Sequence, residues 1–436
     1  MRIFAILLIA ILNLSLSFKT LVAAPRQQLD LTEQVSPNGF HFALANSNIQ
    51  DVVAIALAMP CGLACDSPET YAAGAIGPTA AWHSGAGNLS ASETYEGFKD
   101  FSTHLSFGAN SDNFLLGLSA PSRGIEGAVK LTNELMLHPA LKENAIIRLR
   151  SQLAQQFEES RLDDEMKSFI GFLRASADAA GYEHYFLPEP ADIGKVTSTH
   201  IVDWLRLHLS THGILISVVG DITPHSAGVL VDELLAHVPP TSLLGHVPGA
   251  TFHSGGEIVE LKGNGGAQAV VSFGASVAKP STLTSWIGGR MLSAIFADGS
   301  KSRMFRDIRE KIGATYGLQL DFNFYESLTM NRITGRIAEA KLPDAIAQMR
   351  KSWDDFRENG PTDIEAAEAR AAMLNEINDI SHDHMRFAET LRDVLAGHWS
   401  VDEIATIPSL IAQIDLKDKT LLTEFFPPNP IIVVVK

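Results

Sequence analysis

Two histidine pairs are the first places to look for metal chemistry, because imidazole is a common zinc ligand. His208 and His212 stand four residues apart, which is the spacing of a helical zinc pair. Leu209 and Thr211 occupy the two places where such a motif carries its general base. We therefore expect this pair to end a helix, where a histidine suits the negative end of the helix dipole.

The other histidines are weaker candidates. His382 and His384 are two residues apart, so they point to different sides of a helix. His83 is a single imidazole, and one ligand does not make a metal site, so we expect it in a partly exposed loop. The sequence predicts no metal site built from histidines.

The chain has two cysteines, Cys61 and Cys65, separated by three residues. A reactive redox motif would have only two residues between them. Either the two thiols pair in an oxidising compartment or both stay reduced and buried, and the sequence leaves both alternatives open.

Arg309 and Tyr316 combine a guanidinium and a phenol seven residues apart, with Gly313 between them as the expected end of a helix. This spacing places the arginine on the last helical turn and the tyrosine on the strand that follows. Taken alone, it is more typical of a surface arginine and a core tyrosine than of a site.

Composition limits the class of protein. The chain has 436 residues, 46% of them hydrophobic, so it can bury a large core in two or three domains. Its net charge of −16 repels phosphate, which argues against nucleic-acid binding and against anionic membrane surfaces.

The first residues are typical of an export signal. Arg2 precedes the apolar run 3–18, and Lys19 and the small residues Val22-Ala23-Ala24 follow it. We expect residues 1–24 to be a signal peptide cleaved after Ala24; the alternative is a retained membrane anchor. Export places the protein in the periplasm if the source is Gram-negative. No later segment is expected to span a membrane.

Hydrophobic periodicity gives the first half of the chain alternating strands and helices. We expect two paired strands at 40–45 and 52–60. Four helices should follow at 92–106, 125–137, 145–161 and 198–209, and then a buried strand at 213–220. The segment 239–256, rich in proline and glycine, is the expected linker. The second half is expected to hold strands 258–262, 267–275, 315–325 and 328–337 with helices 283–296 and 302–312.

The second half repeats the first. The helix at 145–156 has a counterpart 220 residues later at 365–376, and the strand 214–219 has one 217 residues later at 431–435. We therefore expect an α+β fold of two homologous domains, 35–238 and 257–436, each a mainly antiparallel sheet with helices on one side, facing each other across a cavity.

The segment from Ser302-Arg303-Met304-Phe305 through Ile308-Arg309-Glu310-Lys311 to Tyr316-Gly317 resembles the second-domain signature of the insulinase- or pitrilysin-type zinc metallopeptidases. Gln268, Gly220-Asp221 and the run 193–197 fall where that family has similar residues. The resemblance covers nearly everything from about Asn38 to the end.

The resemblance implies a zinc motif, H-x-x-E-H, on a helix that should start near Gly74. This chain has Gly77, Pro78, Thr79, Ala80 and Ala81 at the motif positions, so both imidazoles and the catalytic carboxylate, expected at Gly77, Ala81 and Ala80, are missing. The third ligand of the family, a glutamate, should fall at Gln155, Gln156 or Glu158. We expect no metal on this chain and zinc on a partner subunit.

In the family, the counterparts of Arg309 and Tyr316 bind peptide carbonyls across the cavity, and the phenol can stabilise the oxyanion of hydrolysis. The resemblance thus implies a zinc-less subunit of an exported two-chain peptidase, forming a heterodimer with a catalytic homologue and binding peptide at Arg309 and Tyr316. The alternatives are a non-enzymatic peptide-binding or structural subunit, similar to respiratory-complex core subunits, and an autonomous metallopeptidase.

Overall fold

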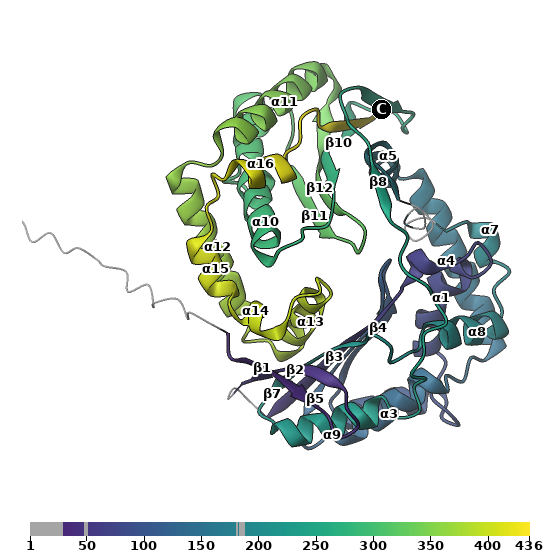
Figure 1. The fold of residues 1–436 in the computed structure, drawn as a ribbon. Helices are drawn as coiled ribbons and strands as arrows, with labels where there is room; N and C mark the ends of the chain where they lie inside the picture. Colours follow the sequence, from purple (N-terminus) through teal and green to yellow (C-terminus); the bar gives the residue numbers. More distant parts are fainter. Residues whose placement is uncertain (1–28, 48–50, 180–181, 183–187) are drawn as a thin grey trace, which may run out of the picture.

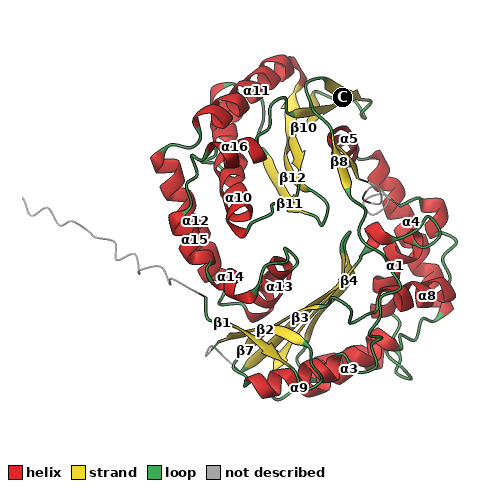
Figure 2. Ribbon diagram, in the orientation of Figure 1, coloured by secondary structure: helices red, strands yellow, loops and turns green. Residues whose placement is uncertain are grey.

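The computed structural model describes residues 29–47, 51–179, 182 and 188–436. The expected signal peptide, 1–24, lies outside this part of the chain. Two large sheets face each other from opposite sides of the molecule's centre, each backed on its outer side by helices (Figures 1 and 2). No helix among the described residues is long and apolar enough to cross a membrane.

The first sheet has the order β1-β2-β7-β3-β5-β4. Its strands are β1 Leu31–Val35, β2 His41–Asn46, β3 Val52–Pro60, β4 His104–Ala109, β5 Asn113–Pro121 and β7 Leu215–Gly220. The helices of this half are η1 Leu63–Cys65, α1 Tyr71–Trp82, α2 Ala91–Asp100, α3 Ile125–Leu137, α4 Glu143–Leu162, α5 Asp164–Ser176, α7 Pro190–Ile193, α8 Ser198–His208 and α9 Pro224–Leu234.

The second sheet has the order β11-β12-β10-β13-β9. Its strands are β9 Ile258–Leu261, β10 Gln268–Val277, β11 Gln319–Phe324, β12 Thr329–Ala338 and β13 Ile431–Val435. The helices are α10 Leu283–Ala297, η2 Phe305–Lys311, η3 Glu339–Lys341, α11 Leu342–Asn359, α12 Asp363–Ile380, α13 His384–Leu395, α14 Val401–Ala405, α15 Ile407–Gln413 and α16 Lys419–Phe425. A small sheet pairs β6 Ala177–Ala179 with β8 Ala250–Phe252, so the expected linker contains a strand.

The internal repeat is visible in the strand order. Strands at the same place in the two sheets also come at the same place along the chain within each half; the two orders are β2-β7-β3-β5-β4 and β9-β13-β10-β12-β11. Each pair of neighbouring strands is parallel or antiparallel in the same way in both sheets. The two closing strands, β7 and β13, each lie parallel to one neighbour and antiparallel to the other. The predicted α+β fold of two similar units is confirmed.

One helix from each half packs on the sheet of the other half. Helix α13 packs on β3 and β7 of the first sheet, while α5 packs on β10 and β13 of the second. The strand β3 shows why this is possible: Val53, Ile55 and Leu57 face the outer helices, and the small residues Ala54 and Ala56 face α13. Each sheet is packed by helices of its own half on one side, as the sequence predicted, and a helix from the other half covers its second side.

Buried serines fix these exchanged helices. On α5, Ser168 and Ser176 bond Ser272 and Ser276 of β10, with Oγ–Oγ distances of 2.8 and 2.7 Å. On the first sheet, Ser217 Oγ donates to a main-chain carbonyl of α13 at 2.7 Å. These bonds satisfy polar groups inside an otherwise apolar interface.

Several expected elements differ from the structure. The strands β2 and β3 do not pair with each other, because β7, from the far end of the half, lies between them. The expected helix 92–106 ends at Asp100, and His104–Ala109 is the edge strand β4. Ser102, with φ of 52°, turns the chain between them. The strand β1 was not expected, since its residues are mostly polar.

Candidate functional site

The expected zinc-motif positions lie on α1, and they are buried. Gly77 packs against α8, where a Cβ would lie 3.3 Å from the Trp204 ring. Ala80 and Ala81 are 4% and 0% exposed within the core of the first half. The side chains of glycine and alanine have no atom that can bind a metal, so these three positions of α1 cannot supply the ligands that the family motif would require.

The candidates for the third ligand lie on α4. Gln155, Gln156 and Glu158 are all exposed, and Gln155 donates to Glu159 along the helix at 2.9 Å. The side of α4 that packs on the core carries Leu153 and Phe157 instead. Within the described part of the chain, no three histidine, cysteine or carboxylate side chains form a group that could hold a metal ion.

The histidine pairs are also separated by the fold. His208 ends α8 and is 1% exposed, whereas His212 is exposed in the loop before β7. Burial lowers the pKa of His208 to about 4, so its imidazole is neutral at pH 7. The prediction that it interacts as a cation with the end of the helix dipole is therefore wrong. His382 is exposed, while His384 is buried against Ser47. His83 is an exposed residue at the end of α1.

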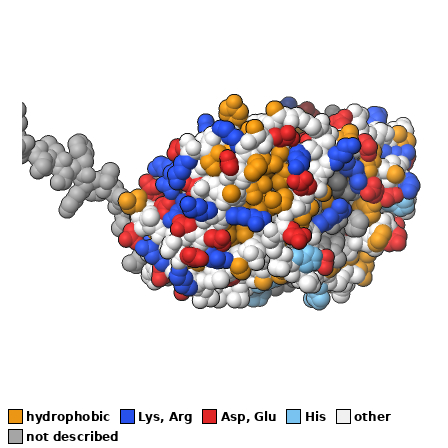
Figure 3. Space-filling view, turned by 90° about the horizontal axis from the view of Figure 1, so that it is seen from above, with side chains coloured by type: hydrophobic (Ala, Val, Ile, Leu, Met, Phe, Trp, Pro, Cys, Tyr) orange, Lys and Arg blue, Asp and Glu red, His pale blue; other side chains and the backbone are white. Residues whose placement is uncertain are grey.

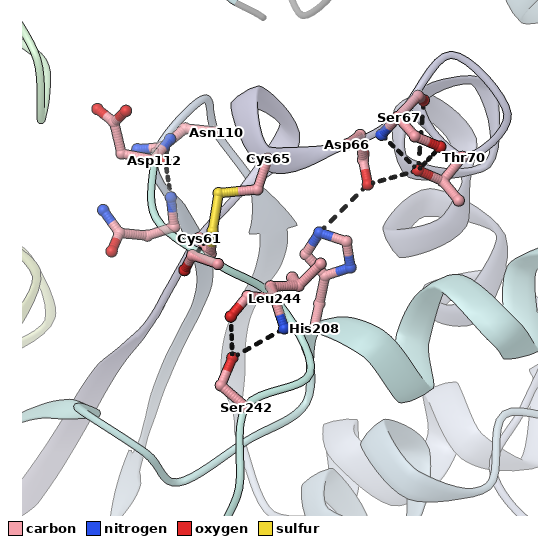
Figure 4. Close-up of a disulfide and its surroundings, with 12 residues drawn as sticks. Cys61, Cys65, Asp66, Ser67, Thr70, Asn110, Asp112, His208, Ser242 and Leu244 are labelled. Carbon is pink, nitrogen blue, oxygen red and sulfur yellow. Dashed lines mark hydrogen bonds and ion pairs between the residues drawn. A yellow bond between two sulfur atoms is a disulfide. The ribbon is translucent and has the colours of Figure 1, made fainter. Parts of the chain in front are cut away.

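Cys61 and Cys65 form a disulfide that links the residue after β3 to the last residue of η1 (Figure 4). Of the two alternatives left open by the sequence, pairing is therefore the one observed. The bridge fixes the segment that leads into α1.

Asp66, next to the disulfide, forms a buried polar cluster that the sequence did not reveal (Figure 4). It accepts hydrogen bonds from Trp204 Nε1 at 2.9 Å and Thr70 Oγ1 at 3.1 Å, and His208 Nε2 lies 3.5 Å from it. The Asp66 and His208 side chains are both 0% exposed. Burial raises the pKa of Asp66 to about 6 against the opposing effect of these hydrogen bonds.

The Ser302–Phe305 part of the family-like segment has a structural role. Arg303 forms two hydrogen bonds to Glu365 at 3.0 and 2.9 Å and a third to the Gly360 carbonyl at 2.8 Å. Glu365 also caps α12 and accepts from Arg306. Despite burial, these bonds and the two charges lower the pKa of Glu365 to about 2. The start of η2 is thus tied to the junction of α11 and α12.

Arg309 lies on η2 and is exposed, with its guanidinium 4.8 Å from the centre of the Phe305 ring. Gly313 ends the helix as predicted: its φ is 65°, and its N–H donates to the Arg309 carbonyl at 3.0 Å. Tyr316 lies in the loop before β11, three residues short of the strand on which it was expected. It is 84% exposed, so it is not a core tyrosine.

A pocket of about 740 Å³ lies between α10, α12 and β11. An ion pair between Arg290 and Glu376, with an N–O distance of 2.7 Å, joins the two helices along its wall. In the repeat, α10 corresponds to α1 and α12 to α4, so this pocket occupies the position in the second half that the expected zinc site has in the first.

The comparisons with known proteins agree with this fold. The model of the peptidase M16 inactive domain matches residues 195–373. The predicted resemblance to a non-catalytic insulinase-type (M16) protein is confirmed. No curated protein sequence matches this M16-like chain.

Solved structures show the M16-like fold over nearly the whole chain. The peptidase M16 inactive domain from Pseudomonas fluorescens is 15% identical, with a TM-score of 0.72, and the match covers 93% of this chain and 98% of that one. The periplasmic protease PqqL from Escherichia coli is 16% identical, with a TM-score of 0.80, covering 93% and 45%. A chain of complex III2 from Candida albicans is 13% identical, with a TM-score of 0.71, covering 93% and 95%. The M16-like chain thus spans less than half of PqqL, and at these identities the likeness concerns the fold.

Proposed function

We propose that this M16-like chain is the zinc-less subunit of an exported two-chain peptidase. It pairs with a homologous chain that carries an intact H-x-x-E-H motif and holds the zinc. Its own contribution is to bind the peptide substrate through Arg309 and Tyr316.

One contrast carries the proposal. The positions expected to hold zinc, Gly77, Ala80 and Ala81, are apolar and buried, whereas Arg309 and Tyr316 are exposed on a segment held by Arg303. An exposed guanidinium and an exposed phenol are the groups that hydrogen-bond peptide carbonyls, and neither is needed by the core. A protein that kept only its fold would have no use for this pair.

Two further observations support export and assembly. The disulfide between Cys61 and Cys65 is the chemistry of an oxidising compartment. The structural likeness to a chain of complex III2, which is a multi-subunit assembly, supports a role beside other chains.

Reconstitution with a catalytic partner tests the proposal. The M16-like chain is mixed with a homologue bearing H-x-x-E-H, and peptide cleavage is followed by fluorescence. Arg309→Ala is expected to lower kcat/KM severalfold, and Tyr316→Phe is expected to lower it through loss of the hydroxyl donor. Arg148→Ala on the exposed side of α4 serves as the matched control. An unchanged rate for Arg309→Ala contradicts the proposal.

A non-enzymatic peptide-binding subunit is the second candidate. Among the described residues, the edge strands β4 and β11 each pair with a strand on one side only, so their other edges offer main-chain groups to an extended peptide. Peptide binding by the purified chain, with no catalytic partner recovered in pull-downs, favours this alternative. Stoichiometric zinc in elemental analysis would instead support an autonomous metallopeptidase.

A further inference from the structure

The internal repeat leaves one strand without a counterpart. In the first sheet, β1 pairs antiparallel with β2 and covers that edge. In the second sheet, β9 occupies the position of β2, but its only partner in the described part of the chain is β13. The second sheet therefore has an open edge where the first has an additional strand.

The open edge of β9 is available for hydrogen bonding. Leu261 directs its carbonyl toward β13, where it accepts from the Lys436 N–H at 3.2 Å. Successive residues of a strand alternate in direction, so the N–H and C=O groups of Ile258 and Glu260 point away from the sheet. Both residues are exposed. The strand lies beside the carboxyl terminus marked in Figure 1.

A basic groove of about 550 Å³ runs between β9 and α5. Among the described residues, its lining includes four cationic side chains and no acidic one: Arg161, Lys167, Arg174 and Lys262. At the rim, Lys167 pairs with Asp164 at 2.8 Å and Arg161 pairs with Glu189 at 2.7 Å. Apolar surface from Ile170, Val259 and Leu261 forms the rest of the groove.

This concentration of positive charge is local. The chain as a whole carries −16, and side chains of both signs are interspersed on the face seen in Figure 3. A groove lined by cations next to an open strand edge favours a ligand that combines an extended backbone with carboxylates.

We infer that the β9 edge and this groove bind an extended, acidic segment of a partner chain. The segment adds to β9 as β1 adds to β2, through the outward main-chain groups of Ile258 and Glu260. Because side chains alternate along a strand, carboxylates at every second position enter the groove, while the intervening side chains face away. This surface is separate from the peptide-binding role proposed for Arg309 and Tyr316.

A fluorescent peptide that alternates valine and glutamate tests the inference by anisotropy. Glu260→Pro removes the outward N–H without breaking a bond to β13, so it is expected to weaken binding at least about tenfold. Glu260→Ala, which loses the same ion pair with Lys436 but keeps the N–H, is the matched control and should bind normally. Lys262→Glu is expected to weaken binding about fivefold, and added salt should weaken it further.

Three results would overturn the inference. The first is equal binding by the native chain and Glu260→Pro, with unfolding curves showing that both are folded. The second is equal affinity for a peptide that alternates valine and lysine. The third is concentration-dependent dimerisation that Glu260→Pro abolishes, which would identify the occupant as a second copy. Arg309→Ala should leave this binding unchanged, so the outcome is independent of the proposed function.

Discussion

Asp66 and His208 show how burial sets the charge of individual residues. Both side chains are fully enclosed, and desolvation shifts their pKa values in opposite directions, to about 6 and about 4. At pH 7 the carboxylate is ionised and the imidazole neutral, so the negative charge is stabilised by the hydrogen-bond donors Trp204 and Thr70.

The raised pKa of Asp66 predicts a pH-dependent stability. The folded state binds this proton more tightly than the unfolded state, so its contribution to stability is complete below pH 3.8 and is lost as the pH rises through about 6. The contribution of His208 has the opposite sign: it is complete above pH 6.5 and is lost as the pH falls through about 4. The two slopes oppose each other between pH 4 and 6.

Asp66→Asn should therefore remove the decrease in stability with rising pH that Asp66 causes and leave the increase that His208 causes. Its unfolding free energy is expected to rise with pH between 4 and 6 more steeply than that of the native chain, by about 1–3 kcal/mol over the interval. Urea unfolding at several pH values measures this, with Asp100→Asn on the exposed end of α2 as the control. Parallel curves for the native chain and Asp66→Asn would refute the assignment.

At the level of elements, Gly313 connects the η2 helix to the loop that carries Tyr316. Its φ of 65° is readily adopted by glycine, and Lys341 donates to the carbonyls of Ile312 and Gly313 at 2.8 and 3.0 Å. The position of Tyr316 relative to Arg309 therefore depends on this turn.

Gly313→Ala should strain the turn and destabilise the fold by about 1 kcal/mol. If the proposed function holds, the same change should lower reconstituted cleavage by displacing Tyr316. Thermal unfolding and the peptide assay measure the two effects separately. Gly299→Ala provides a comparison, because Gly299 has a similar φ of 70° but lies outside the segment between Arg309 and Tyr316. A larger loss of cleavage in Gly299→Ala than in Gly313→Ala would contradict the conclusion that the Gly313 turn positions Tyr316.

Local patterns predicted the elements better than their pairing. The helix α3 begins and ends at the predicted residues, Ile125 and Leu137, because its apolar residues follow one helical face. The strands β2 and β3 were correctly placed within a residue or two, but β7 separates them, and a contact between residues about 170 apart leaves no local pattern. The same holds for Asp66, whose partner Trp204 is 138 residues away. That the sequence contains no H-x-x-E-H motif was readable because it depends on residue types alone.

At the scale of the whole molecule, the tips of two hairpins from different halves meet. Asp112, between β4 and β5, accepts from Tyr182 Oη at 2.7 Å and from the Glu326 N–H, between β11 and β12, at 3.0 Å. Ser327 Oγ donates to the same tyrosine oxygen at 3.2 Å. Burial raises the pKa of Asp112.

Asp112→Ala should loosen this contact between the halves. It removes both acceptors from a buried site, which is expected to cost about 1–3 kcal/mol of unfolding free energy. Denaturant unfolding measures the loss, and increased hydrogen exchange at residues 325–328 would locate it. Asp51→Ala, an exposed aspartate before β3, is the control. Equal stabilities for the two variants would show that the contact contributes nothing.

The exchange of α5 and α13 between the halves affects how the protein is made. Among the described residues, the alanine-lined side of β3 packs against α13, which lies about 170 residues after β7 in the chain. We therefore expect the first sheet to expose an apolar side, and to be prone to aggregation, until His384–Leu395 has docked on it.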